Sequence, residues 1–181
     1  MMDFLGLPQD HSCPINVHVN SSKPDKESAA QRFCDNFPRL PISARSRLVL
    51  EVDDKKSQFT SIDLKTMIHN RIGIPLTFDF LHNKCNPPDL IGECDSLKIC
   101  LDSWPSGVTP ITHYSDSRRI FEDSSSKENA HSDWIWQSPE TYGFQFDIEF
   151  EVKKKDLAVL KYISEKETLY EKLNGDSGVR G

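Results

Sequence analysis

Apolar and polar residues alternate without interruption between Tyr142 and Lys153. The apolar positions are Phe144, Phe146, Ile148, Phe150 and Val152. Side chains alternate between the two faces of a strand, so the pattern predicts a β-strand with one buried and one solvated face. We expect Phe146, Ile148 and Phe150 to be buried. Their expected packing partners are Leu64, Met67 and Ile68.

Three shorter segments upstream have the same strand character. They comprise residues 15–19, 47–53 and 76–81. Polar or proline-containing stretches separate them, as is usual between strands. Residues 96–102 fit either a strand or a helical turn, because so few positions do not distinguish a period of two from one of 3.6.

Two segments have the pattern of amphipathic helices. In the first, Leu64, Met67, Ile68 and Ile72 share one face, Thr60 or Ser61 can cap the start, and Gly73 can end the helix. The second begins at Asp156, runs to about Leu173, and leads into a tail that we expect to be disordered. Residues 28–37 fit a helical turn, because Pro38 and Pro41 prevent a longer helix.

The composition divides the chain into an ordered domain and flexible segments. Residues 1–12 form a flexible arm, residues 13–155 one domain, and residues 156–181 the C-terminal helix and its tail. Serine, aspartate, glycine and proline enrich residues 105–138, so we expect a mobile insertion there. Within it, Trp134 and Trp136 either anchor the loop on the core or present a binding hot spot to a partner.

This order of elements is that of the β-grasp fold, an α+β mixed sheet with one packed helix. The chain adds a long insertion before the last strand and a C-terminal helix. More narrowly, it resembles the ubiquitin-like domain near the C-terminus of Polycomb RING-finger proteins. The matching positions are Leu64, Ile68, Ile74, Pro75, Leu97, Trp104 and the strand 144–152 with Lys153. The resemblance implies a non-catalytic scaffold module, such as a subunit of a nuclear repressor assembly.

Charge and composition restrict the function classes. The chain has 181 residues and a formal net charge of −6, which argues against a general phosphate-backbone binder. It has no apolar stretch long enough to cross a membrane and no secretory leader, so we expect a nuclear or cytoplasmic protein. Five cysteines without a C-x-x-C pair argue against a disulfide framework or a closed zinc site.

Candidate chemistry is sparse. His82 and Cys85, with Cys94 and Cys100 downstream, come nearest to a metal-binding pattern, but their spacing matches no closed tetrahedral site. Without a strained nucleophile turn or a phosphate loop, we expect no enzyme, no cofactor and no metal. Two alternatives stay open: a small hydrolase, or a subunit of an RNA-processing complex that contacts RNA through aromatic residues. Those residues are Trp104, Trp134 and Trp136.

We therefore expect another protein as the partner, and neither nucleic acid nor a membrane. A partner would engage an exposed strand edge or the C-terminal helix, with the insertion tryptophans as secondary candidates. The candidate partner-binding residues are Ile15, Val17, Val19, Trp134, Trp136, Tyr162, Ile163, Leu169, Tyr170 and Leu173.

Overall fold

The computed structural model describes the backbone of residues 1–175 and the side chains of residues 1–168. Two compact units make up the chain. Unit 1 consists of Met1–Tyr114 and Pro139–Glu149, and unit 2 of Ser115–Ser138 and Phe150–Gly181. Among the described residues, no helix is both long and apolar enough to cross a membrane.

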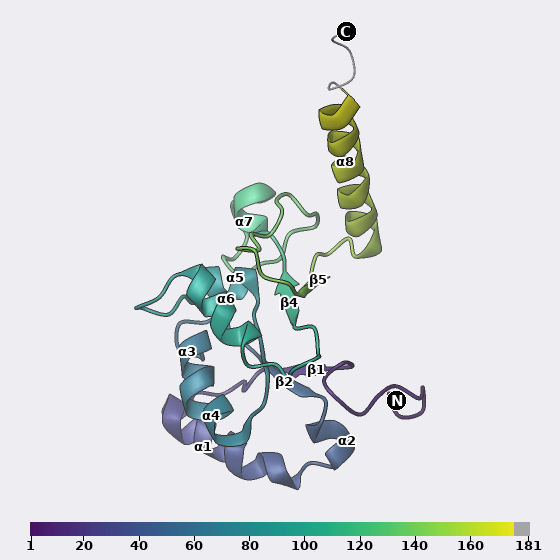
Figure 1. Ribbon diagram of the computed structural model, residues 1–181. Coiled ribbons are helices and arrows are strands. Elements are labelled where there is room, and N and C mark those ends of the chain that lie inside the picture. Colours follow the sequence, from purple (N-terminus) through teal and green to yellow (C-terminus); the bar gives the residue numbers. More distant parts are fainter. Residues whose placement is uncertain (176–181) are drawn as a thin grey trace. The chain divides into compact units, whose positions relative to one another are not determined.

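A parallel sheet forms the centre of unit 1. Its strands are β1 (Ile15–Val17), β2 (Leu48–Glu51) and β3 (Leu76–Thr77), which lie side by side in chain order (Figure 1). Ile15 pairs with Leu48, and Leu50 pairs with Leu76. All four residues of β2 are buried, as expected for the middle strand of a parallel sheet that is covered on both faces.

Helical segments make both crossovers between these strands. Between β1 and β2 lie α1 (Lys26–Asn36), the short 3-10 turn η1 (Phe37–Arg39) and α2 (Ile42–Arg45). Between β2 and β3, α3 (Ser61–Leu64), the π-helical segment η2 (Lys65–His69) and α4 (Asn70–Ile72) follow one another directly. Parallel neighbours cannot be joined by a tight turn, so helical crossovers of this kind are needed.

The helical segment after β2 confirms the prediction for residues 60–73. Thr60 and Asp63 form a reciprocal capping box at its start. Gly73 ends it with a φ of 70°, a left-handed conformation that glycine adopts without a steric penalty. Leu64 and Ile68 are completely buried, so the predicted apolar face is the core face.

Beyond β3, unit 1 continues with α5 (Phe80–Cys85), α6 (Glu93–Leu101) and β4 (Ile111–Tyr114), and β5 (Asp147–Phe150) pairs with β4. Asp79 and His113 form a parallel bridge that joins the end of β3 to β4. Neighbouring strands therefore follow chain order from β1 to β5. This order, with helices in the parallel crossovers, is typical of (β/α) barrels.

The β-grasp prediction is wrong. The sequence predicts one helical turn over residues 28–37, but residues 28–36 belong to the 11-residue helix α1, in the crossover that lets β1 and β2 pair in parallel. α1 ends at Asn36, and Pro38 lies at the start of the turn η1, where its missing N–H breaks no helical hydrogen bond, so the residues before it are free to form three turns. The expected strand 76–81 is two residues long and gives way to helix α5, and residues 96–102 are mainly helical, in α6.

The predicted last strand is present but shorter. In β5, Asp147 and Glu149 are exposed while Ile148 and Phe150 are partly buried, which confirms the alternation but not the full burial. The Phe146 ring lies 6.3 Å from that of Phe80, between ring centroids, instead of on the expected helix face.

Unit 2 contains α7 (Arg118–Phe121) and α8 (Asp156–Gly175). α8 matches the predicted C-terminal helix, and the tail beyond residue 175 lies outside the described residues. The predicted insertion, residues 105–138, contains β4, α7 and the buried side chain of Ile135. Whether it is mobile in solution stays a prediction.

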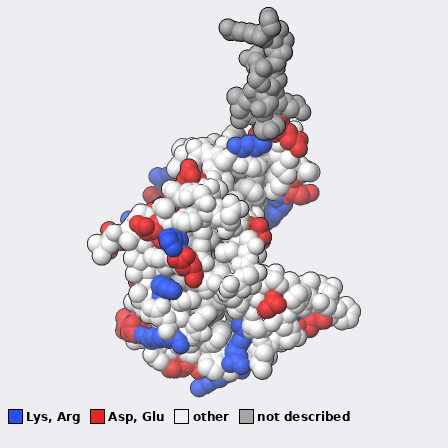
Figure 2. All heavy atoms as spheres, viewed as in Figure 1, with Lys and Arg blue, Asp and Glu red and all other residues white. Residues whose placement is uncertain are grey.

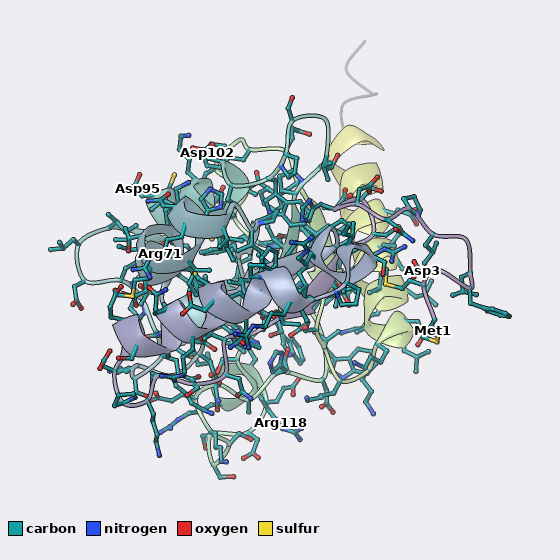
Figure 3. The ribbon with its side chains drawn as sticks, turned by 90° about the horizontal axis from the view of Figure 1, so that it is seen from below. Met1, Asp3, Arg71, Asp95, Asp102 and Arg118 are labelled. Atoms are coloured by element: carbon teal, nitrogen blue, oxygen red, sulfur yellow. The ribbon has the colours of Figure 1, made fainter. Side chains whose placement is uncertain are left out.

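Charged side chains of both signs are interspersed on the face drawn in Figure 2. One ion pair ties helix α4 to helix α1: Arg71, labelled in Figure 3, bonds to Gln31 at 2.8 Å and also to Glu27. Another holds the N-terminal arm, where the buried Arg47 contacts Asp3 at 2.7 Å. The Arg47 guanidinium also donates to the carbonyls of Leu7 and Pro8, each at 2.7 Å. The predicted flexibility of residues 1–12 stays a prediction.

Candidate metal centre

Histidine and carboxylate side chains gather in unit 1 at the carboxyl ends of the parallel strands. Glu51 is the last residue of β2, His18 follows β1, and Asp79 lies just beyond β3. His82 is on α5, and His113 is on β4. The carboxyl end of such a sheet is where parallel α/β proteins place their ligands and catalytic groups.

Local structure explains why Asp79 and His82 come together. Asp79 is the N-cap of α5, and its Oδ1 accepts a hydrogen bond from the backbone N–H of His82 at 2.7 Å. A cap holds the side chain three residues further on in the first turn of the helix. One short segment therefore delivers a carboxylate and an imidazole to the same place.

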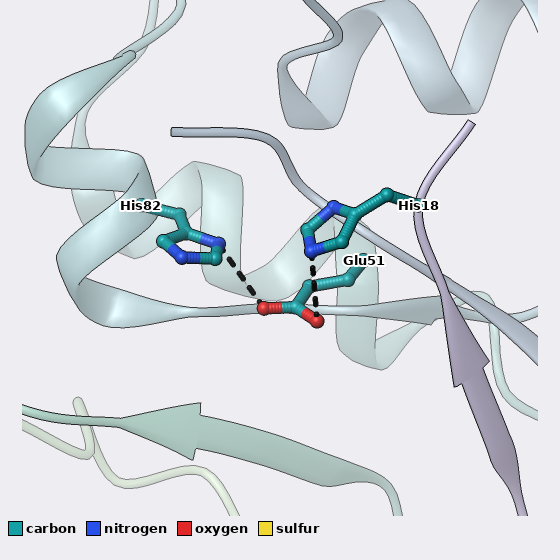
Figure 4. A group of neighbouring side chains, drawn as sticks. All are labelled: His18, Glu51 and His82. Carbon is teal, nitrogen blue, oxygen red and sulfur yellow. Dashed lines mark ion pairs between the residues drawn. The ribbon is translucent and has the colours of Figure 1, made fainter. Parts of the chain in front are cut away.

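Glu51 is the common partner of three imidazoles. Its carboxylate is 3.1 Å from Nδ1 of His82, 3.3 Å from Nδ1 of His113 and 3.4 Å from Nε2 of His18. Figure 4 shows His18 and His82 on either side of this carboxylate. Asn16 also donates a hydrogen bond to Glu51 from β1. The Glu51 side chain is only 4% exposed, so these contacts are shielded from solvent.

The charges in this cluster depend on one another. Burial acts to raise the pKa of Glu51, but hydrogen bonds from His113 and His82, with the charges of His113 and His18, outweigh it and hold the pKa well below its usual range. Burial acts to lower the pKa of His82, yet Glu51 and Asp79 raise it to about 9. The pKa of His18 is also raised, mainly by its hydrogen bond to Asp53. Without a cation, the carboxylates therefore favour the protonated forms of His18 and His82.

A second layer of contacts orients two of the imidazoles. Asp53 lies 3.0 Å from Nδ1 of His18, and its other oxygen accepts from the N–H of Phe59 at 3.1 Å. Nδ1 of His82 is 3.1 Å from the carbonyl of Val52. Asp53 thus holds His18 by the nitrogen opposite the one that faces Glu51, as partners of metal-binding histidines do, whereas the Val52 carbonyl meets the His82 nitrogen that also faces Glu51.

Asp79 is a buried carboxyl group with one oxygen that lacks a hydrogen bond from the part of the chain that the structure describes. Its side chain is completely buried, and its Oδ2 has no hydrogen-bond partner among the described residues. Burial and the nearby Glu51 raise the pKa of Asp79 to about 6, although His82 opposes this. A buried carboxylate oxygen without a partner is costly to a fold, and a bound cation would satisfy it.

The donor atoms are close enough to share a cation. Ligand atoms of His18, Glu51 and His82 all lie within 4.8 Å of one another, and the same holds for those of Glu51, Asp79 and His113. Glu51 thus belongs to both sets. Mixed imidazole and carboxylate donors suit divalent transition-metal ions such as Mn²⁺ or Zn²⁺.

The residues proposed from the sequence as a partner site lie elsewhere. Ile15 and Val17 are partly buried on β1, and Val19 is partly buried just after it. Trp134, Trp136, Tyr162 and Ile163 belong to unit 2. The side chains of Leu169, Tyr170 and Leu173 lie outside the described residues. Whether any of these residues binds a protein stays a prediction.

The third tryptophan considered for stacking on RNA is not available for it. Trp104 is 8% exposed, and its ring N–H donates to the carbonyl of Leu76 at 2.8 Å. The indole is therefore part of the core of unit 1.

Sequence reasoning missed the cluster because its members are spread over almost 100 positions. A usable signal was the acidic residue that ends a buried apolar run, as Glu51 ends 48–51. The segment from Leu76 to His82 gives the same signal with Asp79. We had paired His82 with Cys85, whereas its neighbours in space are Glu51 and Asp79.

The chain is thus a (β/α)-type protein whose parallel strands carry a candidate metal centre at their carboxyl ends. Comparison with known families agrees with this class: the model of the family described as UV-endonuclease UvdE matches residues 1–179. The chain belongs to the UvdE family.

Individual relatives support the assignment. The chain is 32% identical over 161 residues to a UV DNA damage endonuclease of Bacillus pumilus, covering 83% of this chain and 48% of that protein. It is 32% identical over 174 residues to a UV DNA damage endonuclease of Bacillus velezensis, covering 91% of this chain and 51% of that protein. The chain spans about half the length of these relatives.

A solved structure gives the same result for the fold. The crystal structure of SacUVDE superimposes with a TM-score of 0.74 and 29% sequence identity, over 93% of this chain and 55% of that one. The described strands therefore belong to the UvdE fold, and the resemblance to Polycomb ubiquitin-like domains is wrong.

Family membership also overturns three functional predictions. A non-catalytic scaffold in a repressor assembly is wrong, because the family is one of endonucleases. The exclusion of an enzyme is wrong for the same reason. The exclusion of nucleic acid is wrong, because the relatives are named for damaged DNA. The net charge misled us, since it averages over the whole chain while DNA binding depends on local surfaces.

Proposed function

We propose that this chain acts on DNA that carries ultraviolet damage, as a metal-dependent endonuclease or as the part of one that holds its metal centre. The observation that carries the proposal is the buried Glu51 carboxylate, which lies within 3.4 Å of three imidazoles at the carboxyl ends of the strands. Family membership supports the choice of substrate. The sequence pattern had not led us to expect a metal.

His18, Glu51 and His82 would hold one divalent cation, and Asp79 and His113 would join Glu51 around a second. A bound cation supplies Lewis-acid stabilisation of the charge that develops on a phosphodiester during cleavage. Asp79 fits this role because its buried Oδ2 has no other partner among the described residues.

The protein's own groups would organise the site. Asp53 and the Val52 carbonyl hold the rings of His18 and His82 in position. Glu149, whose side chain is 69% exposed, lies 3.7 Å from Nε2 of His113 and places a negative charge beside that imidazole at the solvent side. Neutral imidazoles are required for ligation, so cation binding would expel the protons that Glu51 and its acidic neighbours now hold in place.

DNA as the substrate also sets the expected location. A repair endonuclease works in the compartment that holds the DNA, which is the cytoplasm of a bacterium or the nucleus of a eukaryote.

The test is strand incision of plasmid DNA, ultraviolet-irradiated or untreated, with Mn²⁺ or with a chelator. We expect nicks in irradiated DNA only, in the presence of the metal only. Glu51→Gln should reduce the rate by at least about 100-fold, because it removes the carboxylate common to both donor sets. Glu27→Gln, at an exposed carboxylate on α1, is the control and should cut at the wild-type rate. Equal cutting by wild type and Glu51→Gln would contradict the proposal.

A further inference from the structure

Three consecutive lysines, Lys153–Lys155, form an exposed turn between β5 and α8 in unit 2. None of the three makes an ion pair with another described side chain, although other lysines such as Lys26 and Lys98 do. The chain as a whole carries a net charge of −6. Acidic residues flank the turn in the sequence, at Glu151 and Asp156, yet three adjacent ammonium groups without an ion pair to the described part of the chain make it locally more positive than the chain as a whole.

The backbone of this turn is fixed. The N–H of Lys153 donates to the carbonyl of Ser132 at 2.9 Å, and that of Lys154 donates to Asp133 at 3.0 Å. Lys155 has a φ of 51°, in the left-handed region that a lysine adopts only at a cost. Strained backbone of this kind persists where the surrounding structure imposes it, and it is concentrated at functional sites.

An aromatic surface adjoins the turn through the same segment. Trp136, 45% exposed, is held by hydrogen bonds to Asp116 at 2.7 Å and to Glu122 at 2.9 Å. Lys161, on the second turn of α8, lies 5.1 Å from the ring centroids of both Trp134 and Trp136. Phe121 stacks on the Trp136 ring with centroids 6.4 Å apart, and Lys161 lies over it, so neighbouring side chains hold the indole beside the segment to which the lysine turn is hydrogen-bonded.

We propose that the Lys153–Lys155 turn contacts the phosphate backbone of DNA. The inference rests on the proposed function for the kind of ligand, and it adds a surface that the metal centre does not include. Each ammonium can pair with one phosphate oxygen, and no base is read. The turn would therefore contribute affinity that is the same for damaged and undamaged duplex.

Salt dependence tests this directly. For each phosphate contact, the slope of log affinity against log salt concentration changes by about 0.9. Binding of the 181-residue chain to a defined duplex would be measured over a range of salt concentrations. The duplex is used with and without one photoproduct, and a chelator in the buffer prevents cleavage. The variant K153Q/K154Q/K155Q should lose roughly 2 to 3 units of slope on both duplexes.

The matched control removes the same charge elsewhere. K84Q/K98Q/K127Q alters three other exposed lysines, and its slope should stay within about 0.5 of the wild type. A third variant, Lys155→Gly, relieves the left-handed strain while removing one charge. This variant should be at least as stable as wild type, yet its slope of log affinity against log salt should fall by about one unit. A lower slope in a stable protein shows that a phosphate contact, and not the fold, has been lost.

The outcomes separate this inference from the proposed function. If the lysine-turn variant keeps the wild-type slope, or loses no more than the matched control, the turn is not a phosphate contact. The same conclusion follows if the wild-type chain binds neither duplex at low salt. If the slopes change as expected but irradiated DNA is not cut with Mn²⁺, the binding surface stands and the proposed endonuclease activity fails.

Discussion

At the residue scale, the Glu51 carboxylate raises the pKa of His18 and His82 and so favours their protonated forms when no cation is present. The pKa of His82 is raised to about 9, so this ring is protonated at neutral pH and has no lone pair for a metal. Metal binding must therefore compete with protons.

A pH dependence follows. The apparent affinity for Mn²⁺ should increase as the pH rises from about 6.5 to 9, by up to ~10-fold per pH unit, because the cost of removing the proton from His82 declines over this range. Isothermal titration calorimetry in buffers of different ionisation enthalpy would give both the affinity and the number of protons released. An affinity that is constant over this range, without proton release, would contradict this description of the cluster.

Asp79 provides a second prediction at the residue scale. Its pKa is raised from 3.8 to about 6, so the contribution of Asp79 to the stability of the metal-free chain is fully present below about pH 3.8 and is lost as the pH rises through about 6. Asp79→Asn removes the ionisable group but keeps an oxygen that can cap α5. At pH 7 the metal-free variant should be more stable than wild type by up to roughly 3 kcal/mol.

The same variant should lose most of the stabilisation that Mn²⁺ gives, because an amide is a poorer ligand than a carboxylate. Thermal unfolding with and without the metal measures both effects. Asp102→Asn, at an exposed carboxylate on the C-terminal side of α6, is the control and should change neither. A metal-free Asp79→Asn chain that is markedly less stable than wild type would show that Asp79 serves the fold and not a ligand.

At the scale of elements, local signals predicted the helix after β2 correctly, and longer-range features were missed. Thr60 and Gly73 act within one turn of the chain, so the sequence alone defines both ends of that helix. The strands of the sheet are two to four residues long, too short for periodicity to separate them from a turn. Phe78 and Phe80 alternated like a strand, but Asp79 between them caps a helix.

The site could not be read from the sequence for a related reason. Glu51 and His82 are 31 positions apart, and only the parallel pairing of β2 with β3 brings their segments together. A β-grasp sheet does not bring these two segments together, so the interval between Glu51 and His82 along the chain gave no sign of a shared site. A residue pattern identifies a site only when the fold that assembles it is known.

A buried and an exposed leucine on two helices give a stability prediction. Leu64 is completely buried in α3, whereas Leu160 on α8 is 63% exposed. Leu64→Ala should lower the free energy of unfolding by about 2 to 5 kcal/mol, and Leu160→Ala by less than about 0.5 kcal/mol. Urea unfolding followed by circular dichroism measures both. Similar losses for the two variants would contradict the assignment of the core face.

The N-terminal arm provides another prediction for an element. Arg47 is 2% exposed and bonds to Asp3 and to the carbonyls of Leu7 and Pro8, a fork of contacts that lysine cannot reproduce. Arg47→Lys should increase hydrogen exchange in residues 1–12 by about 10-fold or more while β2 keeps its protection. Fast exchange in the wild-type arm, unchanged by the substitution, would instead support the flexible arm expected from the sequence.

At the scale of the whole molecule, neither the net charge nor the length of the chain decides whether it acts on DNA. A formal charge of −6 does not exclude DNA, because three adjacent lysines without ion pairs in the described part of the chain can act on phosphates within about a Debye length whatever the charge of the whole chain. The chain spans about half the length of its Bacillus relatives, which makes cutting by this chain on its own a proposal to be tested. The metal centre is the part of the account that this chain can support by itself, since five of its donors lie in unit 1.

Anomalous diffraction from crystals of the chain soaked in Mn²⁺ tests the metal centre most directly. We expect anomalous density beside Glu51, from one Mn²⁺ held with His18 and His82 and from a second held with Asp79 and His113. Crystals of Glu51→Gln, soaked in the same way, should lack it. A wild-type map with no peak at Glu51, at Mn²⁺ concentrations that support incision of irradiated DNA, would contradict the account.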